Sequence, residues 1–143
     1  NRGHIFNETL ESIKNQSYSN WECIIIDDES TDETEEVSRY FIENDVRFNY
    51  YKRDKKYAKG TSGSRNNGLD LVKGDFLIFF DDDDIVHPQN LEICVRELEN
   101  DRIDFCRYIR EVFIETFNFK FRLLLSKSSK VLYTSGKTSL LVI

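Results

Sequence analysis

Asp75-Phe-Leu-Ile-Phe-Phe80, followed at once by the four aspartates Asp81 to Asp84, is the stretch that decides the fold. Its unbroken apolar run is the strongest strand signal in the chain. The run Trp21 to Ile26 also predicts a buried strand, because it ends in three consecutive β-branched isoleucines, and it too stops at aspartates, Asp27 and Asp28. The sequence therefore predicts two buried strands, each followed directly by carboxylates.

Helical patterns separate the strands. The expected elements, in chain order, are a helix over 4–15, a strand over 21–26, a helix that a capping box starts at Ser30 and Thr31 and that runs to about Glu43, a strand over 46–52, a mobile charged loop over 53–63, a short helix over 67–72, a strand over 75–80, a helix from Pro88 to about Glu99 and a strand over 103–114. Strands joined through helices imply right-handed crossovers. We therefore predict an α/β fold, with a mostly parallel sheet and helices on both faces.

Composition narrows the possible functions. With 143 residues the chain has the size of one ordinary domain, and its net charge of −6 has the wrong sign for a general nucleic-acid binder. The three cysteines, Cys23, Cys94 and Cys106, are widely spaced among apolar residues. That spacing predicts buried free thiols rather than zinc ligands or disulfides. Apolar runs far shorter than roughly 18 residues predict a chain that does not span a membrane.

The carboxylates that follow the two strands carry the chemistry. In an open parallel sheet the ligand crevice lies beyond the carboxyl ends of the strands, so both acidic clusters are expected at one edge. Carboxylates held at the edge of a core either take up protons or bind a cation. Oxygen ligands without His or Cys indicate Mg²⁺ or Mn²⁺, and such an ion commonly bridges carboxylates to phosphates. The alternative is that the run is a solvated helix entry in which Asp84 serves as a cap.

Two further features have open interpretations. Asp28 could accept hydrogen bonds from a base or sugar edge, or Asp28 or Ser30 could simply cap the next helix. The stretch Gly60 to Gly68 combines glycines, hydroxyls and one arginine before a helix, which is typical of a turn that contacts phosphate, although the spacing matches no standard phosphate-binding motif.

Three segments in this order resemble the family 2 glycosyltransferases of the GT-A fold. They are Leu10 to Asp32, with its Ile-Ile-Ile-Asp-Asp-Glu-Ser-Thr-Asp ending, Gly63-Ser-Arg-Asn-Asn-Gly68, and Phe79-Phe-Asp-Asp-Asp-Asp-Ile-Val-His-Pro88. The resemblance implies a GT-A-like, Rossmann-like domain over 1–143, truncated at both ends. In it, about 1–100 would form the nucleotide-sugar-binding half and about 101–143 the start of the acceptor half.

The resemblance also implies an activity and a set of site residues. The activity is transfer of a sugar, with inversion, from a nucleotide diphosphate donor, commonly a UDP-sugar, to an acceptor hydroxyl with help from Mg²⁺ or Mn²⁺. Asp28 resembles the carboxylate that contacts the base, and Arg65 lies in a turn near the donor, after Ser64 where alanine is common. Asp83 is the expected direct metal ligand of a D-x-D pair with Asp81, and Asp81 or Asp82 would contact the ribose or the ion.

Other parts of the family pattern are expected outside these residues. A first strand would precede Asn1, and the acidic catalytic base would follow Ile143, since Glu111 and Glu115 match no motif. The acceptor would be a glycan, a lipid-linked glycan or a protein. The expected location is cytoplasmic, at the inner membrane face with peripheral association if the acceptor is lipid-linked. The alternatives are a Mg²⁺-binding response-regulator receiver, phosphorylated within Asp81 to Asp84, and a non-catalytic sugar-nucleotide-binding module.

Overall fold

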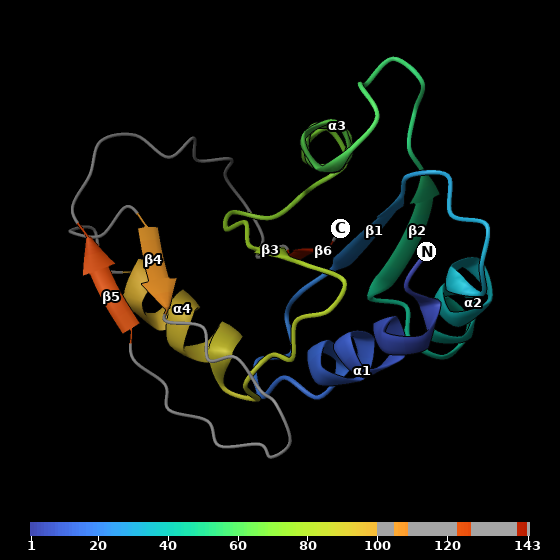
Figure 1. Cartoon of the computed structure of the whole chain (residues 1–143). Helices are drawn as coiled ribbons and strands as arrows, with labels where there is room; N and C mark the ends of the chain where they lie inside the picture. The colour runs from blue at the N-terminus through green and yellow to red at the C-terminus, as the bar shows by residue number, and fades with distance from the viewer. Residues whose placement is uncertain (100–104, 109–122, 127–139, 143) are drawn as a thin grey trace.

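The computed structural model describes residues 1–99, 105–108, 123–126 and 140–142 (Figure 1). Helices and strands alternate through most of this part of the chain. In order they are α1 (Gly3–Lys14), β1 (Cys23–Asp27), α2 (Thr34–Asn44), β2 (Phe48–Lys52), α3 (Thr61–Leu69), β3 (Phe79–Phe80), α4 (Asn90–Leu98), β4 (Phe105–Tyr108), β5 (Leu123–Ser126) and β6 (Leu140–Val142).

The main sheet is parallel throughout. Its strands lie in the order β2-β1-β6-β3, and each neighbouring pair is parallel. In the centre of the sheet Ile25 of β1 pairs with Tyr50 of β2 on one side and with Val142 of β6 on the other. The crossovers from β1 to β2 and from β2 to β3 contain α2 and α3, respectively. The expected α/β fold with a parallel sheet is therefore confirmed.

Helices cover both faces of β1, as predicted (Figure 1). On one face Cys23 and Ile25 pack with α1 and α2 in the larger core cluster, which includes Leu10 and Phe41. On the other face Ile24 and Ile26 pack against residues that follow α3 and against Phe79. Successive strand residues point to opposite faces, so a strand covered on both sides is apolar at every position. This explains the unbroken isoleucine run.

The structure differs from the expected elements at several places. The strand predicted over 75–80 comprises only Phe79–Phe80, which pair with Leu141 and Val142 of β6. The short helix predicted over 67–72 begins earlier, at Thr61. The loop predicted over 53–63 is anchored at its start by Arg53, whose side chain is only 5% exposed. Isolated propensity does not predict strand pairing or the burial of an ion pair.

The described residues also include a second, two-stranded sheet and the cysteines. Of the strand predicted over 103–114, residues Phe105–Tyr108 form β4, which pairs antiparallel with β5, and the others lie outside the described residues, as do Glu111 and Glu115. Cys23 and Cys94 are buried and form no disulfide among the described residues, and burial raises the pKa of Cys23. Cys106 lies in β4, and its side chain is outside the description.

Candidate functional site

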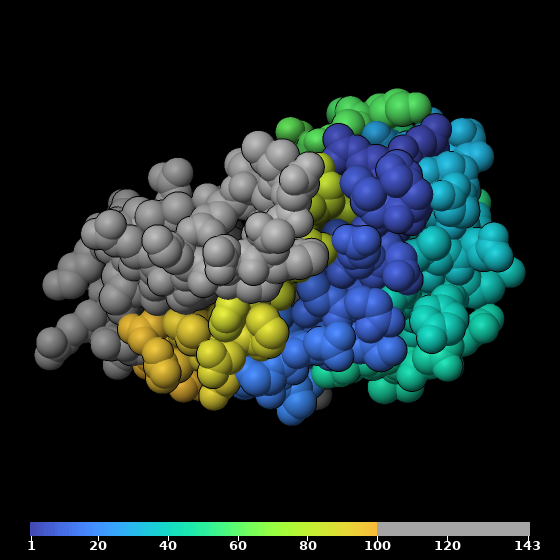
Figure 2. Space-filling view, turned by 60° about the horizontal axis from the view of Figure 1, so that its bottom comes forward, coloured from blue at the N-terminus to red at the C-terminus, as the bar shows by residue number. Residues whose placement is uncertain are grey.

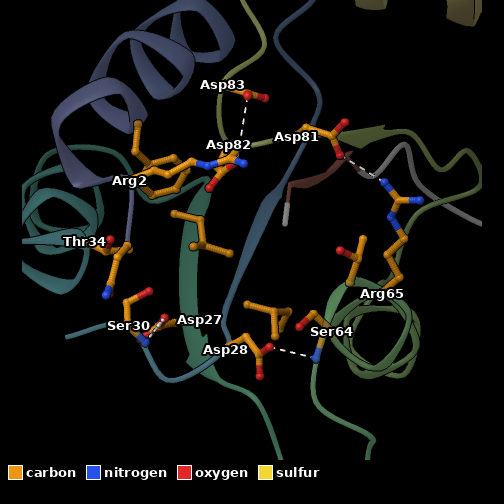
Figure 3. Close-up of a pocket in the computed structure, with 16 residues that line it drawn as sticks. Arg2, Asp27, Asp28, Ser30, Thr34, Ser64, Arg65, Asp81, Asp82 and Asp83 are labelled. Atoms are coloured by element: carbon orange, nitrogen blue, oxygen red, sulfur yellow. Dashed lines mark hydrogen bonds and ion pairs between the residues drawn. The ribbon is translucent and has the colours of Figure 1, made fainter. Parts of the chain in front are cut away.

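A pocket of about 800 Å³ lies at the carboxyl ends of β1 and β3 (Figure 3). Its lining includes all the residues that the sequence analysis assigned to the donor and the metal: Asp28, Arg65, Asp81, Asp82 and Asp83. The first turn of α3 and the N-terminal residues Asn1 and Arg2 complete the wall. A volume in this range is typical of small-molecule sites. The two acidic clusters therefore lie around one pocket, as parallel strand ends allow.

Asp28 is fixed by two donors. The Nε of Arg53 donates to its Oδ1, and the backbone amide of Gly60 donates to its Oδ2 at 2.7 Å. Arg53 in turn donates to the carbonyl oxygen of Tyr57 at 2.7 Å, so it ties the loop that leads to α3. Burial alone would raise the pKa of Asp28, but the hydrogen bonds from Arg53 and Gly60 outweigh it and lower that pKa. Asp28 is thus an ionised group in a set position.

Asp27 lines the same pocket, but both of its carboxylate oxygens accept hydrogen bonds from neighbouring residues. The backbone amide of Ser30 donates to Oδ1 at 2.9 Å, and the hydroxyl of Tyr50 donates to Oδ2 at 2.7 Å. Burial would raise the pKa of Asp27, but these hydrogen bonds lower it further than burial raises it. Asp27 therefore shapes the turn after β1 and connects it to β2.

The turn before α2 differs from the expected capping box. Helix α2 begins at Thr34, and Asp32 accepts hydrogen bonds from the Thr34 hydroxyl at 2.6 Å and from its backbone amide at 3.2 Å. The other oxygen of Asp32 accepts from the backbone amide of Gly3 at 2.9 Å. The start predicted at Ser30 and the alternative in which Asp28 or Ser30 is the cap are both wrong. The N-cap position of α2 is Glu33, which makes no side-chain cap hydrogen bond, and Asp32 just before it joins the starts of α1 and α2.

The aspartate run is a tight turn. The amide of Asp84 donates to the carbonyl oxygen of Asp81 at 3.1 Å, and the Asp84 Oδ2 accepts from the amide of Asp81 at 3.0 Å. Asp84 thus orients the loop. Helix α4 begins only at Asn90, so the alternative of Asp84 as its cap is wrong.

Two arginines pair with the carboxylates that face the pocket (Figure 3). Arg65 Nη2 lies 3.0 Å from Asp81 Oδ1 and joins α3 to the end of β3. Arg2 Nη1 lies 2.8 Å from Asp82 Oδ1 and 2.9 Å from Asp83 Oδ2, so one nitrogen bridges two adjacent side chains. Arg2 was not predicted from the sequence, because no strand or motif spacing connects it to the run.

Side chains of helix α1 and of the residues just after it hydrogen-bond to the aspartate run and to the segment that follows it. Thr9, Ser12 and Gln16 lie on one side of the helix or at its end, at spacings of three and four residues that bring side chains to one face. Their contacts are Thr9 Oγ1 to the Asp82 carbonyl at 3.0 Å, the Val86 amide to Ser12 Oγ at 3.0 Å, Gln16 Nε2 to the His87 carbonyl at 2.8 Å and the Leu91 amide to Gln16 Oε1 at 3.0 Å. Figure 2 shows the blue N-terminal residues beside the yellow-green segment, which contains the residues around 80.

The first turn of α3 requires glycine at two positions. Gly60 has φ +103°, and a Cβ on Gly63 would lie 1.6 Å from the carbonyl oxygen of Ala58. Next to Gly63, Ser64 is 1% exposed, and its Oγ has no hydrogen-bond partner among the residues that the structure describes. The predicted phosphate-contacting stretch is therefore a closely packed helix start, and its Gly60, Thr61, Ser64 and Arg65 line the pocket.

The chain matches the model of the glycosyl transferase family 2 over residues 1–141, and it belongs to that family of enzymes. This sets aside the receiver alternative. Among its relatives, a Campylobacter jejuni GalNAc(5)-diNAcBac-PP-undecaprenol beta-1,3-glucosyltransferase is 38% identical over 84 residues, 59% of this chain and 27% of the relative. The Escherichia coli UDP-Glc:alpha-D-GlcNAc-diphosphoundecaprenol beta-1,3-glucosyltransferase WfgD is 31% identical over 105 residues, 73% of this chain and 40% of the relative.

A third relative, the Streptococcus pneumoniae glycosyltransferase GlyG, is 31% identical over 104 residues, 73% of this chain and 34% of the relative. The matched part thus spans less than half the length of each of these three proteins. In the described part of the chain, no helix is both long and apolar enough to cross a bilayer.

Proposed function

We propose that this domain binds a nucleotide diphosphate sugar, with UDP as the nucleotide part, and that the intact protein transfers the sugar with inversion to an acceptor hydroxyl. One observation carries the proposal: Asp28, Arg65 and Asp81 to Asp83 come from three separate parts of the fold and line a single pocket. Asp28 would contact the base, and Asp82 and Asp83 would face the diphosphate. The donor thus lies along the sheet edge.

The carboxylates of the run suit a divalent cation that arrives with phosphates. Among the residues that the structure describes, no group of three or more His, Cys, Asp or Glu side chains could hold an ion on its own. Mg²⁺ needs fewer protein ligands, because it is usually held by one or two carboxylates together with substrate phosphates and waters. Asp83 and Asp81 provide oxygen-only ligands of this kind. We propose them, with Asp82 beside them, as the protein side of a Mg²⁺ or Mn²⁺ site.

The chain's own residues would act by binding and orienting the donor. Asp28 can accept a base hydrogen bond while it keeps Arg53 and Gly60, because each carboxylate oxygen has two lone pairs. Arg65 stays beside Asp81 and presents its guanidinium to the pocket. The bound ion would supply stabilisation of the negative charge on the departing nucleoside diphosphate. We assign no residue as the base that removes the acceptor proton.

The names of two relatives support a class of acceptor. Both specify glycans linked to undecaprenol through diphosphate, and one specifies a UDP-glucose donor. We therefore propose a lipid-linked glycan as the acceptor, with the protein acting in the cytoplasm at the inner face of the membrane. The lipid would be presented from the bilayer, so peripheral association of the intact protein is sufficient.

Calorimetry on the intact protein tests the donor proposal. We expect UDP to bind in the presence of Mn²⁺ and to bind much more weakly in its absence. Asp83→Asn should abolish the Mn²⁺-dependent part of the affinity, whereas Glu43→Gln, an exposed carboxylate on α2, should leave it unchanged. Equal UDP affinity with and without Mn²⁺ would contradict the metal-assisted site. No UDP binding under either condition would contradict the donor proposal itself.

A further inference from the structure

Arg2 places a single cationic nitrogen between two carboxylates. Its Nη1 lies 2.8 Å from Asp82 Oδ1 and 2.9 Å from Asp83 Oδ2. Two adjacent aspartates of one turn thus contact the same nitrogen atom, which belongs to a residue far away in the sequence. Arg2 is part of the pocket lining (Figure 3). Convergence of two carboxylate oxygens on one positive centre is the arrangement that a divalent cation also requires.

A divalent cation and the Arg2 guanidinium exclude one another at this place. Mg²⁺ and similar ions sit about 2.0–2.1 Å from their oxygen ligands. An ion bound to Asp83 through the oxygen that now contacts Arg2 Nη1 would therefore lie within a few ångströms of that nitrogen, where the two positive charges repel one another. Arg2 and the ion therefore compete for this oxygen.

The displaced guanidinium has a partner of the opposite charge in the proposed donor. In the described part of the chain, the contacts with Asp82 and Asp83 are the only hydrogen bonds found for the Arg2 side chain. The Arg2 side chain is 51% exposed, so packing leaves it room to adopt another position. Arg binds phosphate oxygens through paired N–H groups, and such charge-assisted bonds are strong. Because Arg2 lines the pocket, a diphosphate bound there would lie near its guanidinium.

We propose that Arg2 is an exchangeable counter-cation: it neutralises Asp82 and Asp83 when the pocket is empty and moves to the diphosphate when ion and nucleotide bind. This inference rests on the proposed function. It assigns Arg2 two opposite effects. Arg2 competes with the ion when no nucleotide is present and assists nucleotide binding when the ion is present.

The test measures Mn²⁺ alone and UDP separately in the intact protein. Free Mn²⁺ is followed by electron paramagnetic resonance without nucleotide, and UDP is titrated by calorimetry at saturating Mn²⁺. For Arg2→Ala we expect Mn²⁺ alone to bind about two- to fivefold more tightly, as loss of an exposed competing ion pair allows. UDP should bind about tenfold more weakly, because a charge-assisted phosphate contact is lost.

Two further variants separate the parts of this proposal. Arg39→Ala removes another exposed arginine that is paired with a carboxylate, Glu35, on α2, and it should change neither affinity. Arg2→Lys keeps a cation but loses the planar fork, so Mn²⁺ alone should bind as in the wild type while UDP still binds more weakly.

Several outcomes would overturn the inference. Mn²⁺ affinity that is unchanged or lower in Arg2→Ala would remove the competition, and unchanged UDP affinity would remove the phosphate contact. The wild type reports on the proposed function independently. If the wild type binds neither Mn²⁺ nor UDP, the proposed function fails and the inference fails with it, whereas normal wild-type binding with unaltered Arg2→Ala affinities overturns the inference alone.

Discussion

The backbone amide of Gly60 donates to Asp28 Oδ2 at 2.7 Å, and this bond joins the carboxyl end of β1 to the start of α3. The other carboxylate oxygen accepts from Arg53, whose side chain is 5% exposed. Asp28 therefore holds the pocket together in addition to its proposed role at the base. Stability measurements test the structural role of Asp28, and UDP affinity tests its proposed role at the base.

Asp28→Ala should reduce both stability and UDP affinity. The change removes the Asp28 carboxylate that accepts from the buried Arg53 guanidinium and leaves it Glu29, 3.6 Å from Arg53 Nη2. Loss of a buried partner costs about 1–3 kcal/mol in the free energy of unfolding. Urea denaturation measures that free energy. Glu43→Ala, which removes an exposed charge on α2, is the matched control and should change it little. Unchanged stability in Asp28→Ala would show that Arg53 does not depend on this carboxylate.

The stability of the domain should decline in acid partly through Asp32. Hydrogen bonds from the amide of Gly3 and from Thr34 lower the pKa of Asp32 from 3.8 to about 2. Because the folded-state pKa is the lower one, the unfolded chain takes up the proton more readily. The stabilisation is therefore complete above the unfolded-state pKa near 3.8 and is lost as the pH falls through about 2.

Thermal unfolding of Asp32→Asn across the same pH range checks this. Between pH 4 and pH 2 the melting temperature of the variant should fall less steeply than that of the wild type, because asparagine does not titrate there. Glu43→Gln should follow the wild type. Parallel curves for wild type and Asp32→Asn would mean that the Gly3 and Thr34 contacts do not depend on the charge.

Gly63→Ala should destabilise the start of α3. The new Cβ would lie 1.6 Å from the Ala58 carbonyl oxygen, and this neighbour is backbone, which cannot rotate away. Overpacking of this kind costs about 1–3 kcal/mol. The exposed neighbour Ser62→Ala provides the comparison, with a difference near zero in urea denaturation. Wild-type stability for Gly63→Ala would show that α3 and the loop before it can separate without cost.

Ser64→Ala should make the ligand-free protein more stable. The Ser64 hydroxyl is buried without a hydrogen-bond partner among the described residues, and alanine also has the higher helix propensity. The expected gain is about 1 kcal/mol. Ser38→Ala is the opposite case, because the Ser38 hydroxyl is fully buried and donates to the Thr34 carbonyl at 2.8 Å. That variant should lose stability, and a loss in Ser64→Ala as well would reveal a partner for its hydroxyl.

The sheet and the edge that carries the pocket could be predicted from the sequence, because both follow from buried strands. The isoleucine run of β1 is apolar at every position only if both faces are covered, and this requires helices on both sides. Parallel strands bring their carboxyl ends to one edge, so the aspartates after β1 and after β3 were expected at the same edge, where β6 lies between the two strands. Neither step depends on side-chain detail.

The contacts that hold the pocket could be predicted less well. Arg53 follows β2 directly, so the rule that located Asp28 also puts Arg53 at the same edge, but a charged loop gives no sign that its first residue is buried. Arg2 lies at the aspartate run, and Thr9 and Ser12 of α1 hold the same loop against that helix. Such contacts depend on how α1 packs in three dimensions, and the spacing of residues along the chain does not encode it.

A crystal structure of the intact protein with UDP and Mn²⁺ tests the central claim most directly. The account predicts an anomalous Mn²⁺ peak beside Asp83, bridged by the diphosphate, with the uracil next to Asp28 in the same pocket. A Mn²⁺ peak away from the aspartate run, or a UDP molecule bound outside the pocket between β1 and β3, would contradict it.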